Sequence, residues 1–194
     1  VQTCALPISG ITVYAVNNAY EINDKYFTQL LNLGKFLGKE DRARELVDGT
    51  KSLIEDITSK VTGTYDGKAY AGGMYFQGNP GFLKGTGNFQ PFDLSKVPNA
   101  MPEADNKEPY IVLNETLIVY NPDIIFLDAV QLQDIVNEIV AGYDNYKEIN
   151  AIKNDNIYSN MVTKCYMNNW ENQLVNACYV ASVVNGGLYD WDFE

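Results

Sequence analysis

The chain has 194 residues, enough for one full domain or two small lobes, and its 46% hydrophobic content is sufficient for a core. The net charge of −11 argues against sequence-independent binding of nucleic acid and against attachment to an anionic membrane surface. The sequence contains no histidine, which excludes the usual serine and cysteine triads, HExxH zinc sites and histidine-rich sites for bare zinc or manganese.

The first eight residues, VQTCALPI, match one reading frame of a widely used sequencing-library adapter. We therefore predict that residues 1–8 are not native, that the natural amino terminus is missing and that the start of the sequence says nothing about compartment. Cys165 and Cys178 lack the paired spacing of a zinc site, and we interpret them as partly buried thiols. No apolar run approaches the roughly 20 residues of a membrane span.

The first predicted elements are a strand and two helices. Residues 10–17 form a β-branched run that ends in polar residues, the pattern of a buried parallel strand. From Asp24 to Leu37 apolar residues cluster on one side of a helix, and Gly38 marks a break. A long amphipathic helix then runs to about Val61, with acidic residues at its start and Lys60 in its last turn.

A glycine-rich stretch follows this helix. We predict a strand over 68–76 that leads into the loop GNPGFLKGTGNF, residues 78–89. Glycine at this density allows close approach of the backbone to a ligand. The loop lacks the Lys-Ser/Thr ending of a phosphate-binding loop, so it is a weak nucleotide motif.

Helices and strands alternate in the rest of the chain. An irregular, proline-bearing stretch leads to a helix over 114–120 and to a strand over 123–128, whose run IIFL is typical of a strand buried on both faces. A helix over 132–141, the tract 143–149, a strand over 156–158 and a closing helix over 169–184 follow. This order predicts an α/β fold with a parallel sheet and helices on both faces, without an internal repeat.

Four segments resemble, in order, parts of the substrate-binding proteins of ABC importers for iron–siderophore, haem and cobalamin. The similarity as a whole covers nearly everything after residue 10. They are LGKFLGKEDRARELV (33–47), AGGMYFQGNPGFLKGTGNFQPF (71–92), NETLIVYNPDIIFLD (114–128) and NIYSNMVTKCYMNNWENQLVNACYVASVV (156–184).

The resemblance implies a non-enzymatic, extracytoplasmic protein with two α/β lobes joined by a rigid helix, which binds its ligand between the lobes. Residues 9–38 would end the amino-terminal lobe, 39–62 would form the bridging helix, and 63–194 would form a three-layer carboxy-terminal lobe with a parallel sheet. Half of the cleft would then be missing. The lack of histidine fits the branch of the family whose metal arrives already chelated.

Ligands of open α/β sheets sit beyond the carboxyl ends of the strands, which directs attention to two loops. Aromatic side chains beside lysine suit a large, flat or anionic chelate. Packing in the core explains the aromatic residues equally well, and turn chemistry alone explains the asparagines. The candidates are Tyr75, Phe76, Asn79, Lys84 and Asn88 in the first loop, and Lys164, Tyr166, Asn168 and Trp170 in the second.

The resemblance also implies partners. Members of the family dock on ABC permease subunits through an exposed acidic residue on each lobe, and Asp93 and Glu103 are the candidates, although neither is in register with the usual glutamate. Ordinary solvated carboxylates explain both residues as well. Asp123 is expected to cap local backbone. We expect a monomer without a covalently bound cofactor, whose ligand is a ferric siderophore or a similar chelate, and which reaches the membrane only through a lost lipid anchor or the permease.

Two other classes of function stay open from the sequence. One is an α/β enzyme domain that acts on a small metabolite through tyrosine and carboxylate groups. The other is an α/β sensor or partner-binding domain.

Overall fold

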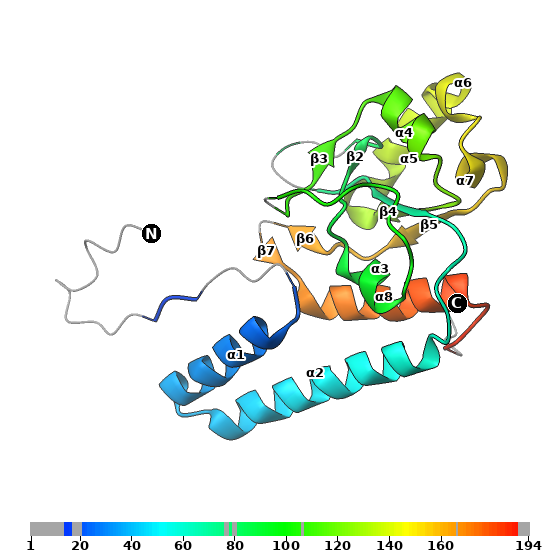
Figure 1. Ribbon diagram of the computed structural model, residues 1–194. Helices are drawn as coiled ribbons and strands as arrows, with labels where there is room; N and C mark the ends of the chain where they lie inside the picture. The colour runs from blue at the N-terminus through cyan, green and yellow to red at the C-terminus, as the bar shows by residue number, and fades with distance from the viewer. Residues whose placement is uncertain are drawn as a thin grey trace. The chain divides into compact units, whose positions relative to one another are not determined.

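The computed structural model describes residues 14–16, 21–75, 78, 81–105, 107–165 and 167–189 (Figure 1). It divides into two compact units, residues 1–52 and residues 53–194. The predicted strand over 10–17 falls largely outside the described residues. No helix among the described residues has both the length and the apolar character needed to cross a membrane.

The first unit contains α1 (Asp24–Leu37) and most of α2 (Glu40–Lys60), two helices that the sequence predicts. The side chain of Asn23 caps α1 by accepting from the N–H groups of Lys25 and Tyr26. Gly38 ends α1 in the left-handed conformation, with φ of 63°. The two helices meet closely at Gly34, where an added Cβ would lie 2.4 Å from the Cβ of Ala43.

The second unit is built on a sheet that has three parallel strands in the described residues. These are β1 (Ala69–Gly72), β4 (Ile124–Asp128) and β5 (Ile157–Asn160), in the order β1-β4-β5. Two small antiparallel pairs accompany the sheet: β2 (Lys84–Gly85) with β3 (Tyr110–Ile111), and β6 (Lys164–Cys165) with β7 (Met167–Asn168).

One face of the sheet packs against helices from the middle of the chain. They are α4 (Asn114–Tyr120), α5 (Leu132–Ala141), α6 (Tyr143–Tyr146) and α7 (Asn150–Lys153), with the 3-10 helix η1 (Ala129–Gln131) leading into α5. Tyr70, Ile125 and Leu127 point from the strands into this core, where they meet Leu117 and Ile135. Alternate residues along each strand therefore point to this face of the sheet.

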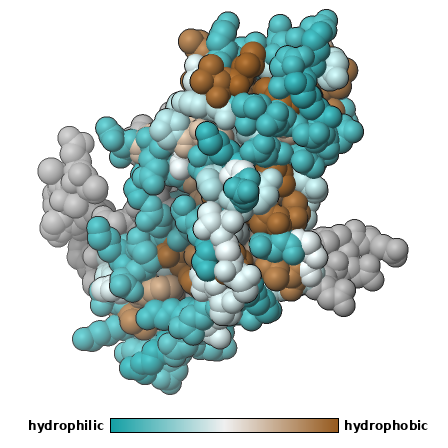
Figure 2. All heavy atoms as spheres, turned by 45° about the vertical axis from the view of Figure 1, so that its right-hand side comes forward, coloured by the Kyte–Doolittle hydropathy of each residue, from teal (hydrophilic) through white to brown (hydrophobic). Residues whose placement is uncertain are grey.

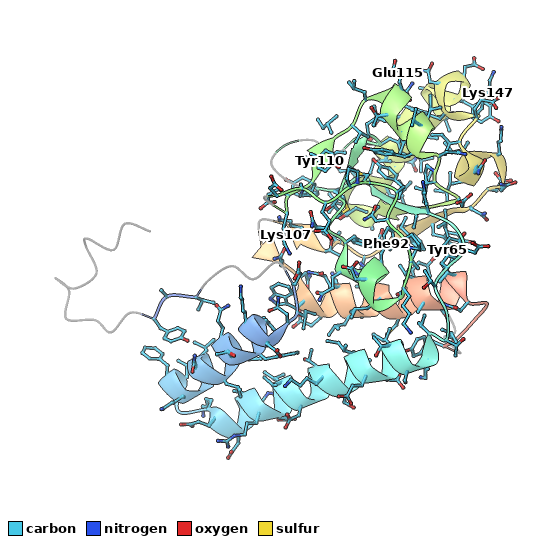
Figure 3. All side chains as sticks on the ribbon, in the orientation of Figure 1. Tyr65, Phe92, Lys107, Tyr110, Glu115 and Lys147 are labelled. Atoms are coloured by element: carbon cyan, nitrogen blue, oxygen red, sulfur yellow. The ribbon has the colours of Figure 1, made fainter. Side chains whose placement is uncertain are left out.

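The other face packs against α3 (Gln90–Leu94) and α8 (Trp170–Val184). Its core contains Ala71 and Phe126 from the sheet and Val180 from α8. Phe92 of α3, labelled in Figure 3, meets Phe126 edge to face with ring centroids 5.6 Å apart. Helices thus cover both faces, which confirms the predicted three-layer α/β arrangement.

A third apolar cluster joins the end of α2 to the outer side of α8. Ile57 and Val61 pack there with Ala177, Cys178 and Ala181. Cys178 is buried and free, as expected of a thiol that acts as a small apolar side chain. The carboxyl end of α2 is therefore part of the second unit's packing.

The surface of the second unit is mainly hydrophilic, but some apolar side chains reach it. Figure 2 shows hydrophobic groups at the top of the view, where Figure 1 places α4 and α6. The exposed apolar residues of this part of the chain include Ile111, Leu113, Val119 and Val140. None of these four belongs to the cores described above.

Candidate functional site

The carboxyl ends of β1, β4 and β5 meet at one edge of the sheet because the three strands are parallel. The strands end at Gly72, Asp128 and Asn160. Both predicted ligand loops begin at this edge, one after β1 and the other after β5. The carboxyl edge is therefore the candidate functional site.

Gly73 turns the chain sharply at the end of β1. Its φ is +68°, and an added Cβ would lie 2.4 Å from the Cδ1 of Ile135, so a larger residue would be both strained and crowded. The turn shortens the predicted strand over 68–76 to Ala69–Gly72. It also allows Met74 N–H to donate to the Lys84 carbonyl at 3.0 Å, which holds β2 against the end of β1.

Lys84, a predicted ligand residue, is buried on β2. Burial lowers the pKa of its ammonium group because desolvation disfavours the charged form. Tyr75 is half-buried close by in the chain. Lys84 can contribute positive electrostatic potential to the site even though its side chain is buried.

Asp128 ends β4 with a side chain that is 0% exposed. Its Oδ1 accepts from the N–H of Val130 at 2.9 Å, while Oδ2 has no hydrogen-bond partner among the described residues. Desolvation raises the pKa of this carboxyl group to about 6, against the opposing effect of the N–H groups of Val130 and Thr163. The carboxyl edge thus contains a buried acid whose pKa is raised towards neutral pH.

Asn160 lies beside Asp128 on the neighbouring strand, since the two residues are register partners. Its side chain is 3% exposed, and its Oδ1 likewise has no hydrogen-bond partner among the described residues. Asp128 Oδ2 and Asn160 Oδ1 thus each lack a hydrogen-bond donor of good geometry among the described residues, although the Thr163 N–H also acts on the Asp128 carboxylate. Buried acceptors are usually satisfied, so this pair marks a place where a donor is wanted.

Amide groups of α8 hold the segment that leaves β5. Asn176 Oδ1 accepts from Met161 N–H at 2.9 Å and its Nδ2 donates to the Met161 carbonyl at 2.8 Å. One turn earlier in α8, Asn172 Nδ2 donates to the carbonyl of Val162 at 2.7 Å. These bonds fix residues 161–162, and hence the start of the second predicted loop, on a rigid helix.

Lys164, a predicted ligand residue, forms an ion pair with Glu108. Both side chains are largely buried, and the pair ties the segment before β3 to β6. Lys107 and Tyr110, labelled in Figure 3, flank Glu108 in this segment. Because Glu108 already balances the charge of Lys164, a bound anion would compete with this carboxylate.

The other predicted residues take different places. Asn88 supports its own loop, since its Oδ1 accepts from the N–H of Ala104 at 3.0 Å. Asn168 and Trp170 are half-buried at β7 and at the start of α8. Asp93 and Glu103 are exposed. Phe76, Asn79 and Tyr166 lie outside the described residues.

Sequence reasoning missed three residues of the carboxyl edge, Asp128, Asn160 and Glu108. An available signal for Asp128 was an acidic residue directly after the buried run IIFL, because a charge there must end at the sheet edge. Asn160 and Glu108 carry no comparable signal. The described residues contain no group of three or more Cys, Asp and Glu side chains suited to a metal ion.

Solved structures of similar fold come from several bacteria. A possible iron-binding (periplasmic solute-binding) protein from Staphylococcus epidermidis matches with a TM-score of 0.69 and 19% identity, over 92% of this chain and 68% of that one. An ABC transporter substrate-binding protein from Listeria monocytogenes matches with a TM-score of 0.67 and 18% identity, over 82% and 63%. IsdE of S. aureus, solved with haem, matches with a TM-score of 0.66 and 16% identity, over 82% and 64%.

At these identities the likeness to solved structures shows the fold. The chain spans 63% of the length of the Listeria protein. No curated protein sequence matches it. The family model for periplasmic binding proteins matches residues 8–160, which is most of the chain. The chain therefore belongs to the periplasmic binding protein family.

Proposed function

We propose that the chain is the extracytoplasmic solute-binding component of an ABC importer, and that it binds an iron–siderophore or a related metal chelate such as haem or cobalamin. The observation that carries this proposal is the family match over residues 8–160. Structural neighbours support the ligand class, since one belongs to an Fe3+-hydroxamate transport system of Saccharomonospora viridis and another was solved with haem.

In this proposal the chelate lies over the carboxyl edge of the sheet. Tyr75 and Trp170 offer partly exposed aromatic surface for stacking, and Lys84 supplies positive charge. An anionic group of the chelate would compete with Glu108 for Lys164. Phe76, Asn88, Tyr166 and Asn168 complete the proposed contact set. The rigid hold of α8 on residues 161–162 would keep the second loop in place before the ligand arrives, which lowers the entropic cost of binding.

The protein would close on its ligand by rotation of two lobes about α2 and then deliver the ligand to permease subunits. Asp93 and Glu103 are exposed and therefore accessible to arginines of a permease. We propose a monomer that acts by binding alone, without catalytic activity. Attachment to the membrane would require a lipid anchor or the permease.

Fluorescence of Trp170 gives a direct test. The chain has two tryptophans, so Trp191→Phe leaves Trp170 as the single reporter. This variant is titrated with ferrioxamine B, ferric enterobactin, haemin and cyanocobalamin. Saturable quenching by one of them is expected, whereas no binding by any of the four would contradict the proposal.

A second variant tests whether the carboxyl edge forms the site. Lys164→Met removes the buried ammonium group, and we expect about tenfold weaker binding of an anionic chelate. Lys153→Met is the matched control, because Lys153 lies on α7 with an exposed side chain paired to Glu148. Equal losses in the two variants would place the ligand elsewhere.

A further inference from the structure

A pocket of about 430 Å³ opens between β5 and α8. Ser159, Asn160 and Met161 line it from the end of β5, and Val175, Asn176 and Tyr179 line it from α8. Small-molecule sites typically have volumes of roughly 300–1,000 Å³. None of the six lining residues is among the proposed chelate contacts, but Asn160 lies at the carboxyl edge of the sheet, so the pocket adjoins the chelate site.

The walls of this pocket are held in place without a ligand. Asn176 is 1% exposed and makes two hydrogen bonds with the main chain of Met161, so α8 and the end of β5 are joined at the base of the pocket. Around the base, Met161 and Val175 are 47% and 39% exposed. The pocket therefore combines a fixed polar base with an accessible apolar rim.

Asn160 supplies an acceptor for which the described part of the chain offers no donor. Its Nδ2 lies 3.5 Å from the Met161 carbonyl, which orients the amide, and its buried Oδ1 has no hydrogen-bond partner among the described residues. A ligand that donates a hydrogen bond to this oxygen would satisfy it.

The surroundings of Asn160 favour a positively charged donor. Asp128 is its register partner, so the two side chains leave neighbouring strands on the same face, and adjacent strands are about 4.8 Å apart. The Oδ2 of Asp128 also lacks a donor among the described residues. A cation on Asn160 would thus lie near a desolvated carboxylate, and the net charge of −11 favours its approach.

We infer that this pocket binds a small primary amine with an aromatic or aliphatic body. The ammonium group donates to Asn160 Oδ1 beside the Asp128 carboxylate, and the body packs against Met161, Val175 and Tyr179. The amine contacts are made by residues other than the proposed chelate contacts, so amine binding can be tested without a chelate.

The test uses three probes that share a body and differ in the donor group: 2-phenylethylamine, 2-phenylethanol and ethylbenzene. Binding is followed by NMR through the main-chain amide of Met161 and the side-chain amides of Asn160 and Asn176. For molecules of this size we expect a Kd of about 1 mM for the amine. The alcohol should bind about fivefold more weakly and ethylbenzene about tenfold more weakly.

Variants locate the site. Asn160→Leu should weaken binding of the amine about tenfold, whereas Asn137→Leu, at an exposed position on α5, should leave it unchanged. Val175→Trp should block the pocket and abolish the shifts, and its partly exposed position keeps the core intact. The inference is overturned if the amine does not bind at about 10 mM, if ethylbenzene binds as tightly, or if Val175→Trp binds like the wild type.

Discussion

The two ends of β4 hold their aspartates in opposite ways. Asp123, at the amino edge of the sheet, accepts from Lys68 N–H at 2.9 Å and from Asn150 Nδ2 at 3.0 Å. Asp128, at the carboxyl edge, is fully buried and its Oδ2 has no donor among the described residues. At the amino edge both oxygens of Asp123 have hydrogen-bond donors, which favours stability. At the carboxyl edge the buried Asp128 lowers stability, as polar groups at functional sites often do.

Replacement of aspartate by asparagine should change the free energy of unfolding in opposite directions at the two ends of β4. The larger change is expected at Asp123. In wild-type Asp123 each carboxylate oxygen accepts one hydrogen bond, from Lys68 N–H or from Asn150 Nδ2. Asp123→Asn replaces one of these oxygens with an NH2 group, which is itself a donor. One hydrogen bond is therefore lost, and two donor groups face each other in its place. We expect the free energy of unfolding to fall by about 3 kcal/mol, measured by urea denaturation. A change below about 0.5 kcal/mol, as expected for the exposed control Asp134→Asn, would contradict this role.

Asp128→Asn should instead stabilise the protein by about 2 kcal/mol at pH 7.5. The amide keeps an acceptor for Val130 N–H, removes the buried charge and offers a donor to Asn160 Oδ1, which has none among the residues that the structure describes. Destabilisation by this variant would show that the N–H groups of Val130 and Thr163 outweigh the cost of burying the charge of Asp128.

The pH dependence of stability should separate Asp128 from the other acidic residues. Its folded pKa of about 6 lies above the ordinary value of 3.8, so the folded state binds the proton more tightly. The contribution of this group to stability is therefore complete below pH 4 and is lost as the pH rises through 6. We propose to measure the free energy of unfolding against pH for the wild type and for Asp128→Asn. The difference between the two curves, wild type minus variant, should fall between pH 4 and 7, and a difference that does not change with pH would contradict the raised pKa of Asp128.

A smaller effect is expected where α8 holds the second loop. Asn172→Ala removes the hydrogen bond to the Val162 carbonyl and should lower the free energy of unfolding by about 1 kcal/mol. Hydrogen exchange should become faster in residues 161–165 and stay unchanged at the amino edge of the sheet. Asn145→Ala, at an exposed position on α6, is the control. If the two variants behave alike, α8 does not hold this segment through Asn172.

The sequence predicts the regular elements well where local signals agree. The helices over 114–120 and 132–141 occur with the predicted bounds. The strand predicted over 68–76 is shorter, because Gly73 turns the chain at a positive φ that alternating hydrophobicity does not report. The β2–β3 and β6–β7 pairs were not predicted, because two-residue strands are too short to show a period.

The candidate site was only partly predictable. Composition and strand order point to the loops that contain Lys84 and Lys164, since ligands of open α/β sheets bind beyond the carboxyl ends of the strands. The burial of both lysines and the pairing of Lys164 with Glu108 depend on contacts between distant segments. The register that places Asn160 beside Asp128 is likewise a product of strand pairing and not of sequence spacing.

Hydrogen exchange with and without the chelate found by fluorescence titration shows which edge of the sheet holds the ligand, because it compares the two edges in one experiment. Slower exchange is expected in residues 73–75, 128–131, 161–165 and 167–170 when the chelate is bound. Exchange at the amino edge, in residues 66–68, 121–123 and 154–156, should not change. Protection confined to the amino edge, or equal at both edges, would contradict the claim that the ligand binds at the carboxyl edge.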